Sequence, residues 1–391
     1  MKKIKVLILK IYIFFIIITF LIININLKIF KIKAKRSLYI YKKYINFCSN
    51  LKNYYRKKIY NENPFISICL PVYNMKKYIE RVIFSIINQS FQDFEIIAVN
   101  DYSKDDTGKI LKKLQAEDER IKVINHSKNF GVYRSRVDGL LLSKGKYVIL
   151  MDPDDMILNP NLFQLLYNYI SIYNLDIVEY KVYRFNEQFG LFEVSDNPYR
   201  NHYHNFDNDI IYQPELSNLF FLNKTDKNYT SVQCRAIWNK IIRKEIIINA
   251  IQYIGKDYYK KFFITAEDTL INLIIIHFAQ NYSNIDLPGY MYNQRIKSIT
   301  HGKRSKKTMK LFYYNYLLYF KKLYKYIKNF NKDRNILYFE LKELKYMLSG
   351  LIKLDNKYKY DINNFYNDIL KDKLASSNFK KYIEMLIKEN N

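Results

Sequence analysis

The chain has 391 residues, enough for one large domain or two ordinary ones with a sizeable core. Lysine and arginine outnumber the acids 64 to 37, a net charge of +27, but residues 1–61 hold 15 of these cations and no acid. The remaining +12 argues against a nucleic-acid binder whose whole surface is basic. The three cysteines, at 48, 69 and 234, are too few and too scattered for a disulfide framework or a zinc site.

A membrane anchor is predicted near the start of the chain. Residues 11–27 form an almost unbroken apolar run between Lys10 and Lys28. As a helix this run measures about 25 Å, close to the thickness of the hydrocarbon core. A cleaved signal peptide is the alternative, but no small-residue cleavage site follows. We expect a single-pass anchor over 1–30 and a basic linker over 31–63 against anionic head groups. Both flanks are basic, so the side of the membrane stays open.

After residue 64 the patterns of strands and helices alternate. Strands are expected at 65–70, 94–99, 121–124, 147–151 and 176–180, and helices at 75–88, 107–116, 132–142 and 162–173. This alternation predicts parallel pairing with right-handed crossovers. The carboxyl ends of the strands would then meet at one sheet edge, where open α/β sheets bind ligands.

The second half of the chain is less regular. Residues 181–226 are polar, aromatic and rich in asparagine, and we expect a variable loop region there. Helical spacing returns over 232–249 and 265–279, and the segment beyond 303 is predicted to be a helical extension. Its aromatic and basic stripes are interpreted as a core face and a solvated face, not as a nucleic-acid surface.

Three carboxylates, Asp152, Asp154 and Asp155, follow the strand at 147–151 within four positions. Acids this close repel one another unless a cation or hydrogen bonds hold them. The arrangement fits a hard divalent metal with a phosphate on its far side. A solvated acidic turn is the alternative that these residues alone leave open.

Four sheet-edge loops carry motifs in a fixed order, and together they resemble the family 2 glycosyltransferases. The motifs are Pro71-Val72-Tyr73-Asn74, Val99-Asn100-Asp101, Asn129 to Arg136, and Asp152-Pro153-Asp154-Asp155. The resemblance covers residues 65–180 and, more loosely, the chain to about 300. It implies an α/β GT-A fold with a mixed, mainly parallel sheet flanked by helices. The domains would be a nucleotide-sugar half at 64–180, an acceptor half at 181–302 and a helical extension at 303–391.

The resemblance assigns the donor side first. Pro71 to Tyr73 would form the wall beside the nucleotide base, although a turn with a packed tyrosine is the alternative. Asp101 would recognise the uracil imide or a ribose hydroxyl, which a carboxylate can accept. A helix-capping turn is its alternative, and Asp105 is the better candidate for that cap. Arg136 would reach a phosphate or brace an acid, and a structural ion pair is equally compatible with its position.

The carboxylates correspond to the DxD signature of the family. Asp154 would coordinate Mn²⁺ or Mg²⁺ bridging the diphosphate. Asp152 would contact the ribose or the sugar and is the second candidate ligand. Asp155 would hold the loop or orient the donor sugar. The cation would stabilise the charge that develops on the leaving diphosphate.

Further residues would serve the acceptor. Asp268 would deprotonate the acceptor hydroxyl as the general base, with Glu267 as the fallback. Their alternative is a pair of acids that is favourable at a helix N-terminus. Trp238 would line the acceptor side, or anchor a helix as a buried ring, and Arg295 would approach the diphosphate.

The sequence thus predicts a membrane-anchored, metal-dependent, inverting glycosyltransferase. It would add one sugar, from a UDP-sugar, to a hydroxyl of a glycan or a lipid-linked acceptor, because the processive Gln-x-x-Arg-Trp signature is absent. Its partners would be the donor, the acceptor and membrane lipids, without nucleic acid. Tyr102 and Val137 depart from the family's common glycine and asparagine. The alternative function is an inactive nucleotide-sugar-binding or scaffolding membrane protein.

Overall fold

The computed structural model describes most of the chain after residue 60. The described residues are 61–187, 191–195, 210–213, 216, 223–224, 229–230, 236–295, 305–330, 348–349, 351–355, 357–372 and 377–390. The predicted anchor at 11–27 lies outside them, as does nearly all of the basic linker. Of the helices within these ranges, none is both long enough and apolar enough to cross a bilayer.

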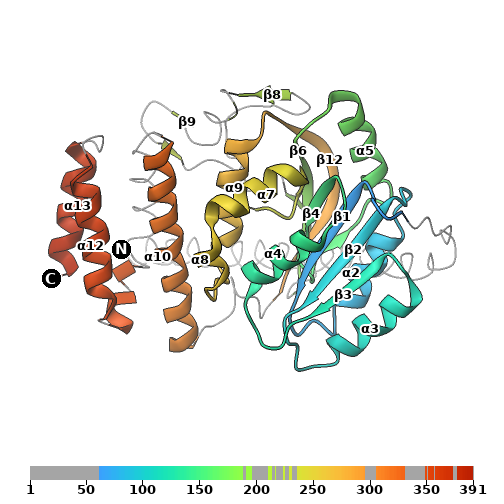
Figure 1. Ribbon diagram of the computed structural model, residues 1–391, viewed down its shortest axis with the longest axis horizontal. Coiled ribbons are helices and arrows are strands. Elements are labelled where there is room, and N and C mark those ends of the chain that lie inside the picture. Colours follow the sequence, from blue (N-terminus) through green and yellow to red (C-terminus); the bar gives the residue numbers. More distant parts are fainter. Residues whose placement is uncertain are drawn as a thin grey trace, which may run out of the picture.

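In the first half, strands and helices alternate as the sequence predicts. The strands are β1 (Ile66–Val72), β2 (Phe94–Asn100), β3 (Ile121–Asn125), β4 (Tyr147–Leu150) and the short β5 (Met156–Ile157). The helices are α2 (Ile79–Ile87), α3 (Thr107–Glu117), α4 (Val132–Leu142) and α5 (Leu162–Tyr173). The order β3-β2-β1-β4 is parallel throughout, so the carboxyl ends of these strands meet at one edge (Figure 1).

The second half of the large sheet is mixed. It adds β6 (Ile177–Asn186), β7 (Leu191–Ser195), β8 (Ile210–Tyr212), β11 (Lys240–Arg243) and β12 (Asn281–Gln294). A separate small sheet pairs β9 (Asn223–Lys224) with β10 (Tyr229–Thr230). The large sheet continues from β4 through β11, β6, β12 and β5. β11 is antiparallel to both neighbours, and β12 is parallel only to β6. Parallel pairing therefore characterises β1 to β4, and antiparallel pairing is as important beyond them.

Three expectations for this half were wrong. The segment 181–226 is not one loop, because it contains the end of β6 and all of β7, β8 and β9. The predicted helix at 232–249 begins with the strand β11, and the helix α7 (Lys244–Ile254) starts only after it. Periodicity cannot separate a four-residue buried strand from the first turn of a buried helix. β12 was not anticipated, since Pro288 and Gly289 interrupt its pattern and shift its register against β6.

β1 also extends further than expected, through Pro71 to Val72. A central strand donates backbone N–H groups to the neighbouring strand on each side, and proline has no N–H to donate. Pairing of β1 with β4 ends at Cys69 and Leu150, whereas pairing with β2 continues to Val72. Pro71 therefore stands where β1 has become an edge on its β4 side, and the strand tolerates it.

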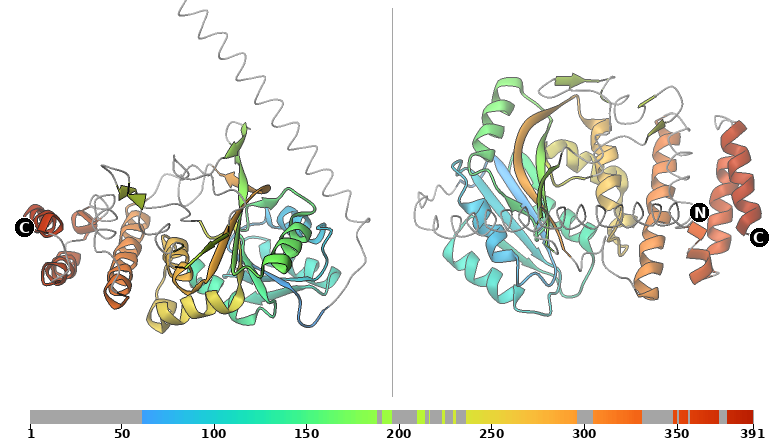
Figure 2. Two further views of the ribbon diagram at one scale, coloured as in Figure 1. Left: turned by 90° about the horizontal axis from the view of Figure 1, so that it is seen from above. Right: turned by 180° about the vertical axis from the view of Figure 1, so that it is seen from behind.

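Two helical layers cover the sheet. α2, α3 and α5 pack on one face, and α4, α7 and α9 (Glu267–Phe278) pack on the other, each with its own apolar cluster. Figure 2 shows the sheet between these layers. The short α8 (Lys256–Tyr259) follows α7. The helical extension predicted beyond residue 303 is present as α10 (Lys306–Asn329), α12 (Tyr358–Leu370) and α13 (Ser377–Asn390), at the end of the molecule away from α5 (Figure 1).

Candidate active site

The loops that follow β1 and β2 are joined into one structure at the carboxyl edge of the sheet. The backbone N–H of Asn74 donates to Ser103 Oγ at 3.0 Å, and Asn74 Oδ1 accepts from the N–H of Lys104 at 2.7 Å. Tyr73 and Tyr102, one from each loop, are 42% exposed. Two partly exposed aromatic side chains thus lie on the edge where the base wall was predicted, and Lys104 Nζ covers one face of the Tyr102 ring at 3.3 Å from its centroid.

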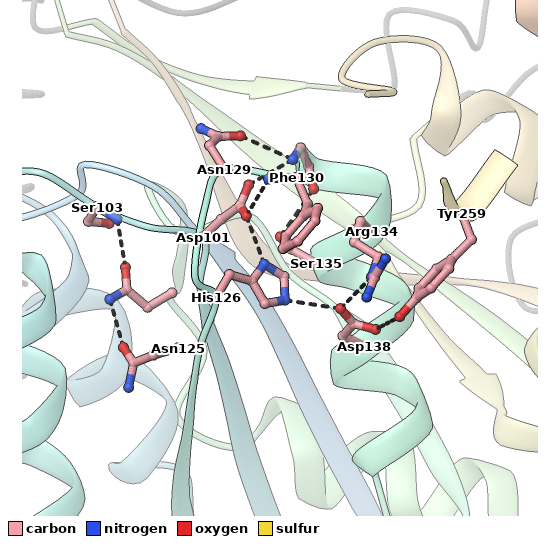
Figure 3. Close-up of polar contacts among 12 residues, drawn as sticks. Asp101, Ser103, Asn125, His126, Asn129, Phe130, Arg134, Ser135, Asp138 and Tyr259 are labelled. Atoms are coloured by element: carbon pink, nitrogen blue, oxygen red, sulfur yellow. Dashed lines mark hydrogen bonds and ion pairs between the residues drawn. The ribbon is translucent and has the colours of Figure 1, made fainter. Parts of the chain in front are cut away.

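Asp101, at the end of β2, organises the start of α4. Its carboxylate accepts hydrogen bonds from the backbone N–H groups of Phe130 and Gly131, each at 2.8 Å. The ring of His126 contacts the same carboxylate, with Nδ1 at 2.7 Å from Oδ1 (Figure 3). Asp101 is buried, so its first role is to hold the loop before α4. A carboxylate offers about four lone-pair sites, so a bond to a nucleotide remains compatible with these contacts.

His126 links this loop to the helical layer. Its Nε2 lies 3.0 Å from Asp138 Oδ2, and Asp138 also accepts from Tyr259 Oη at 2.5 Å and from Arg134 Nε at 2.8 Å (Figure 3). Sequence reasoning missed His126, Asp138 and Tyr259. Their only signals were a lone histidine after a strand and an acid four residues beyond an arginine.

The loop before α4 also touches the segment that leads into α9. Gly131 has φ +91°, and a Cβ there would lie 3.0 Å from Ile264 Cγ2 and 3.4 Å from the carbonyl oxygen of Phe263. The N–H of Tyr133 donates to that same carbonyl at 3.1 Å. The third sequence motif and the Glu267-Asp268 pair, more than a hundred residues apart, are therefore neighbours.

Arg136 joins the two groups of acids directly. Its Nη1 donates to Glu267 Oε1 at 2.5 Å, and its Nη2 donates to Asp152 Oδ1 at 2.7 Å. Arg136 is only 4% exposed. Although burial opposes its charge, Asp152 and Glu267 hold the pKa of Arg136 above its ordinary value. Arg136 therefore forms ion pairs with one acid from each group.

Asp155 faces inward. Tyr290 Oη donates to its Oδ2 at 2.6 Å, and the N–H of Asn293 donates to its Oδ1 at 2.8 Å. The residue is fully buried, and burial together with Asp154 and Asp152 raises its pKa well above the ordinary value. Asp155 thus fastens the loop after β4 to β12. Sequence reasoning selected neither Tyr290 nor Asn293 as a site residue.

Asp154 faces Arg295, which forms an ion pair with it through Nε and Oδ2. Arg295 also lies over the ring of Tyr78, with Cζ 5.3 Å from the centroid. Burial raises the pKa of Asp154 to about 6; Arg295 opposes this rise, and repulsion from Asp152 adds a smaller one. Arg295 therefore lies beside the carboxylate that was predicted to hold the cation.

The two acids at the start of α9 differ in accessibility. Glu267 is 4% exposed, whereas Asp268 is partly exposed. Burial raises the pKa of Glu267 to about 8 in spite of Arg136, and burial likewise raises the pKa of Asp268. Ala266, just before them, has φ +61°, a left-handed conformation that is costly for a residue with a Cβ.

Glu267 leaves one bond unmade. Its Oε1 accepts from Arg136, but its Oε2 is buried and has no hydrogen-bond partner among the described residues. A buried carboxylate oxygen without a donor is costly. A hydroxyl of a bound sugar would satisfy it.

Trp238 is held between two tyrosines of β12. Its ring stacks on Tyr290 and on Tyr292, with centroids 5.1 Å apart in both cases. Tyr180 Oη donates to the carbonyl oxygen of Trp238 at 3.2 Å. This stack joins the acceptor-half segment to the strand that fastens Asp155.

No group of three or more histidine, cysteine or acidic side chains suited to a metal occurs in the parts of the chain that are described. Mg²⁺ and Mn²⁺ are usually held by one or two carboxylates together with substrate phosphates, so a full protein cage is not required. Asp152 and Asp154 are partly exposed, at 25% and 13% of their side chains, and each forms an ion pair with an arginine, Arg136 and Arg295 respectively.

Comparison with known proteins agrees with this geometry. Residues 67–249 match the family model described as Glycosyl transferase family 2. Glycosyltransferase GlyG of Streptococcus pneumoniae is 32% identical over 127 residues, which are 32% of this chain and 42% of that protein. The GalNAc(5)-diNAcBac-PP-undecaprenol beta-1,3-glucosyltransferase of Campylobacter jejuni is 36% identical over 104 residues, 26% of this chain and 34% of that protein. The matches thus span less than half of either relative.

The crystal structure of S. aureus TarS superposes with a TM-score of 0.51 at 18% identity, covering 83% of this chain and 53% of that one. At this identity the likeness concerns the fold alone. Together with the family match, it confirms the α/β, GT-A-like fold that the sequence motifs predicted. The ordered motifs, the sheet edge that gathers them and the family match lead to one conclusion: over residues 67–249 the chain resembles the family 2 glycosyltransferases, as the sequence motifs predicted.

Proposed function

We propose that the chain is a membrane-anchored, inverting glycosyltransferase that moves one sugar from a UDP-sugar to a hydroxyl of a glycan or a lipid-linked glycan. The observation that carries the proposal is the bridge through Arg136, which holds Asp152 of the donor side and Glu267 of the acceptor side on one guanidinium. Donor and acceptor groups thereby share a single site. The relative from C. jejuni, whose name specifies an undecaprenol-linked acceptor, supports the lipid-linked class.

An inverting transfer needs one carboxylate on the face opposite the leaving group. Asp268 is suited to this role because it is partly exposed beside Glu267, whereas Glu267 is bound to Arg136. Asp268 takes the proton of the acceptor hydroxyl as the oxygen attacks the anomeric carbon. Glu267 orients a sugar hydroxyl through its free Oε2. The exposed Tyr73 and Tyr102 provide faces for the nucleotide base.

Asp154, with Asp152, would hold Mn²⁺ or Mg²⁺, and the cation would neutralise charge on the departing diphosphate. The residues fit such an ion because two partly exposed carboxylates follow the same strand and repel each other. When the donor enters, Arg295 can release Asp154 and bind a phosphate of the donor instead. A guanidinium suits a phosphate at least as well as a carboxylate.

The direct test follows sugar transfer from a panel of UDP-sugars by the full chain in detergent with Mn²⁺. Asp268→Asn should abolish transfer while leaving calorimetric donor binding intact, because only the base is removed. Asp286→Asn, at an exposed carboxylate that pairs with Lys181, is the matched control and should transfer normally. Undiminished transfer by Asp268→Asn would contradict the assignment of the base and move it to Glu267.

The metal is tested separately. EDTA should abolish transfer, and Mn²⁺ or Mg²⁺ should restore it in the unaltered chain but not in Asp154→Ala. Equal activity of Asp154→Ala and the unaltered chain would remove Asp154 as the ligand. Donor binding without turnover on every acceptor tried would instead favour an inactive sugar-nucleotide-binding protein.

A further inference from the structure

A surface at the opposite end of the sheet from the candidate active site combines exposed apolar side chains with lysines. We call it the amino-end surface, and it consists of Leu141, Leu142, Lys144, Lys146, Ile172 and Tyr173. We propose that this surface docks onto an anionic lipid bilayer and fixes the orientation of the catalytic body. The proposal concerns a contact of the folded domain, in addition to the predicted anchor, and does not depend on the transferase chemistry.

The strand registers place these residues at one level. Ile66, the first residue of β1, pairs with Phe94 and with Tyr147, the first residues of β2 and β4. The last residue of β11, Arg243, also pairs with Tyr147. α4 ends at Leu142, immediately before β4, and α5 ends at Tyr173, immediately before β6, which is parallel to β4. Both helix ends therefore lie beside the amino ends of the parallel strands.

Polar contacts hold the two helix ends together. Arg243 Nη2 donates to Asn174 Oδ1 at 3.0 Å, just after α5. The N–H of Lys244 donates to the carbonyl oxygen of Lys146 at 3.0 Å, and Lys244 Nζ donates to that of Ser143, just after α4. β11 and the start of α7 thus connect the parts of the amino-end surface into one rigid unit.

The apolar members are exposed to an unusual degree for their size. Ile172 is 71% exposed, Leu141 60%, Leu142 55% and Tyr173 47%. The inner faces of the same helices, such as Leu140 and Ile170, are buried in the core, so the exposed residues are not needed for packing. Leucine and isoleucine beside tyrosine and lysine are the composition of surfaces that lie at a membrane–water interface.

The chain enters the folded body at this surface, which identifies the bilayer as its occupant. The N–H of Lys146 donates to the carbonyl oxygen of Pro64 at 3.3 Å, and the N–H of Tyr147 to that of Phe65 at 2.9 Å. The preceding residues 1–61 carry 15 lysines or arginines, no acid and the apolar run at 11–27. A segment of this composition favours anionic head groups. The exposed Glu62 and Glu245 are opposing charges nearby, as is the partly exposed Asp93, which accepts from the N–H of Phe65; Asp176 is already paired with Arg243.

The test places a fluorescent probe on the full chain in nanodiscs. Ile172→Cys is labelled in a chain that also carries Cys48→Ser and Cys234→Ser, because the remaining Cys69 is buried. The matched control is Tyr360→Cys on α12, which is 76% exposed and lies at the far end of the molecule (Figure 1). Nanodiscs contain phosphatidylcholine alone or with phosphatidylglycerol, and a lipid with a nitroxide on its head group reports proximity.

In phosphatidylglycerol nanodiscs the Ile172 probe should shift to shorter wavelength and be quenched at least two-fold more than the Tyr360 probe. Lys144→Glu combined with Lys146→Glu should remove most of that difference, with unchanged far-ultraviolet circular dichroism showing that the variant is folded. Equal quenching at both probes would overturn the proposal. A blue-shifted Ile172 probe without quenching would also overturn it, because residues 1–60 of the chain would then be the occupant.

Discussion

At the scale of single residues, Arg136 has the most demanding position. It is buried, and its guanidinium neutralises two carboxylates that come from opposite halves of the site. The sequence could predict that an arginine matters here, because the family resemblance singles it out. It could not predict the partner Glu267, since a contact across 131 residues follows from the packing of α4 against the segment before α9 and not from any local pattern.

Arg136→Met should lower the free energy of unfolding by about 3–5 kcal/mol, because removing one member of a buried ionic group leaves uncompensated charge. Urea unfolding followed by circular dichroism measures the loss. Lys113→Met, which removes the exposed pair of Lys113 with Glu117 on α3, should change stability by less than about 0.5 kcal/mol. Similar losses in the two variants would contradict the bridging role of Arg136.

Tyr102 illustrates a departure that the sequence identified and the structure explains. The family commonly has glycine there, and the chain indeed needs φ +64° at this position. Tyrosine accepts the strain of a left-handed backbone, and its ring lies under Lys104, with Nζ 3.3 Å from the centroid. Asp101 shows the reverse case: its position was predicted, but its contacts with His126 and with the N–H of Phe130 were not, because no local pattern marked them.

At the scale of elements, the parallel half was predictable because each strand there is short, apolar and bounded by turn residues. β11 and β12 were not, because β11 reads as the start of a helix and β12 contains proline and glycine. The missed strand β12 is the one that fastens Asp155 through Tyr290 and Asn293. Loss of local regularity therefore coincided with the part of the sheet that serves the site.

The junction between α4 and β4 depends on Gly145. A Cβ at Gly145, just before β4, would lie 2.6 Å from the backbone nitrogen of Ser67 in β1. β1 and the segment before β4 would therefore have to move apart. Gly145→Ala should cost about 1–3 kcal/mol of unfolding free energy. The control is Gly108→Ala in α3, where the nearest contact is 3.2 Å from a side-chain nitrogen of Asn100, and helix propensity should offset the crowding. Thermal unfolding of both variants measures this difference in stability. Equal melting temperatures would contradict the predicted crowding at Gly145.

The start of α9 sets the pH dependence of the proposed transfer. Burial raises the pKa of Asp268 above its ordinary value of 3.8. Because only the deprotonated carboxylate can accept the hydroxyl proton, kcat/KM should fall as the pH drops through that raised pKa. A pH–rate profile with saturating Mn²⁺ should show the acid limb above pH 4. Calorimetry at the same pH values shows whether donor binding is retained, so that protonation of the base can be told apart from weaker binding of the donor. A flat profile down to pH 4 would argue against Asp268 as the base.

At the scale of the whole molecule, the helical extension shares its core with the catalytic body. One apolar cluster runs from β4 through α7 and α9 to α10 and α12, and Phe320 of α10 is fully buried within it. Phe320→Ala should cost about 3–5 kcal/mol. It should lower a single unfolding transition, seen alike by circular dichroism and by the fluorescence of Trp238, the chain's one tryptophan. Two separate transitions would show that the extension folds by itself.

The length of the parallel strands would also set the distance between the bilayer and the candidate active site. β1 has seven residues, which span about 23 Å at 3.3 Å each. With the amino-end surface on the head groups, the carboxyl edge would stand about that far from the membrane. On this proposal, a sugar attached directly to a lipid would lie below Asp268, whereas the tip of a glycan several sugars long would reach it. The length of the sheet would then select acceptors by size: short glycans would not be modified, and longer glycans would be extended.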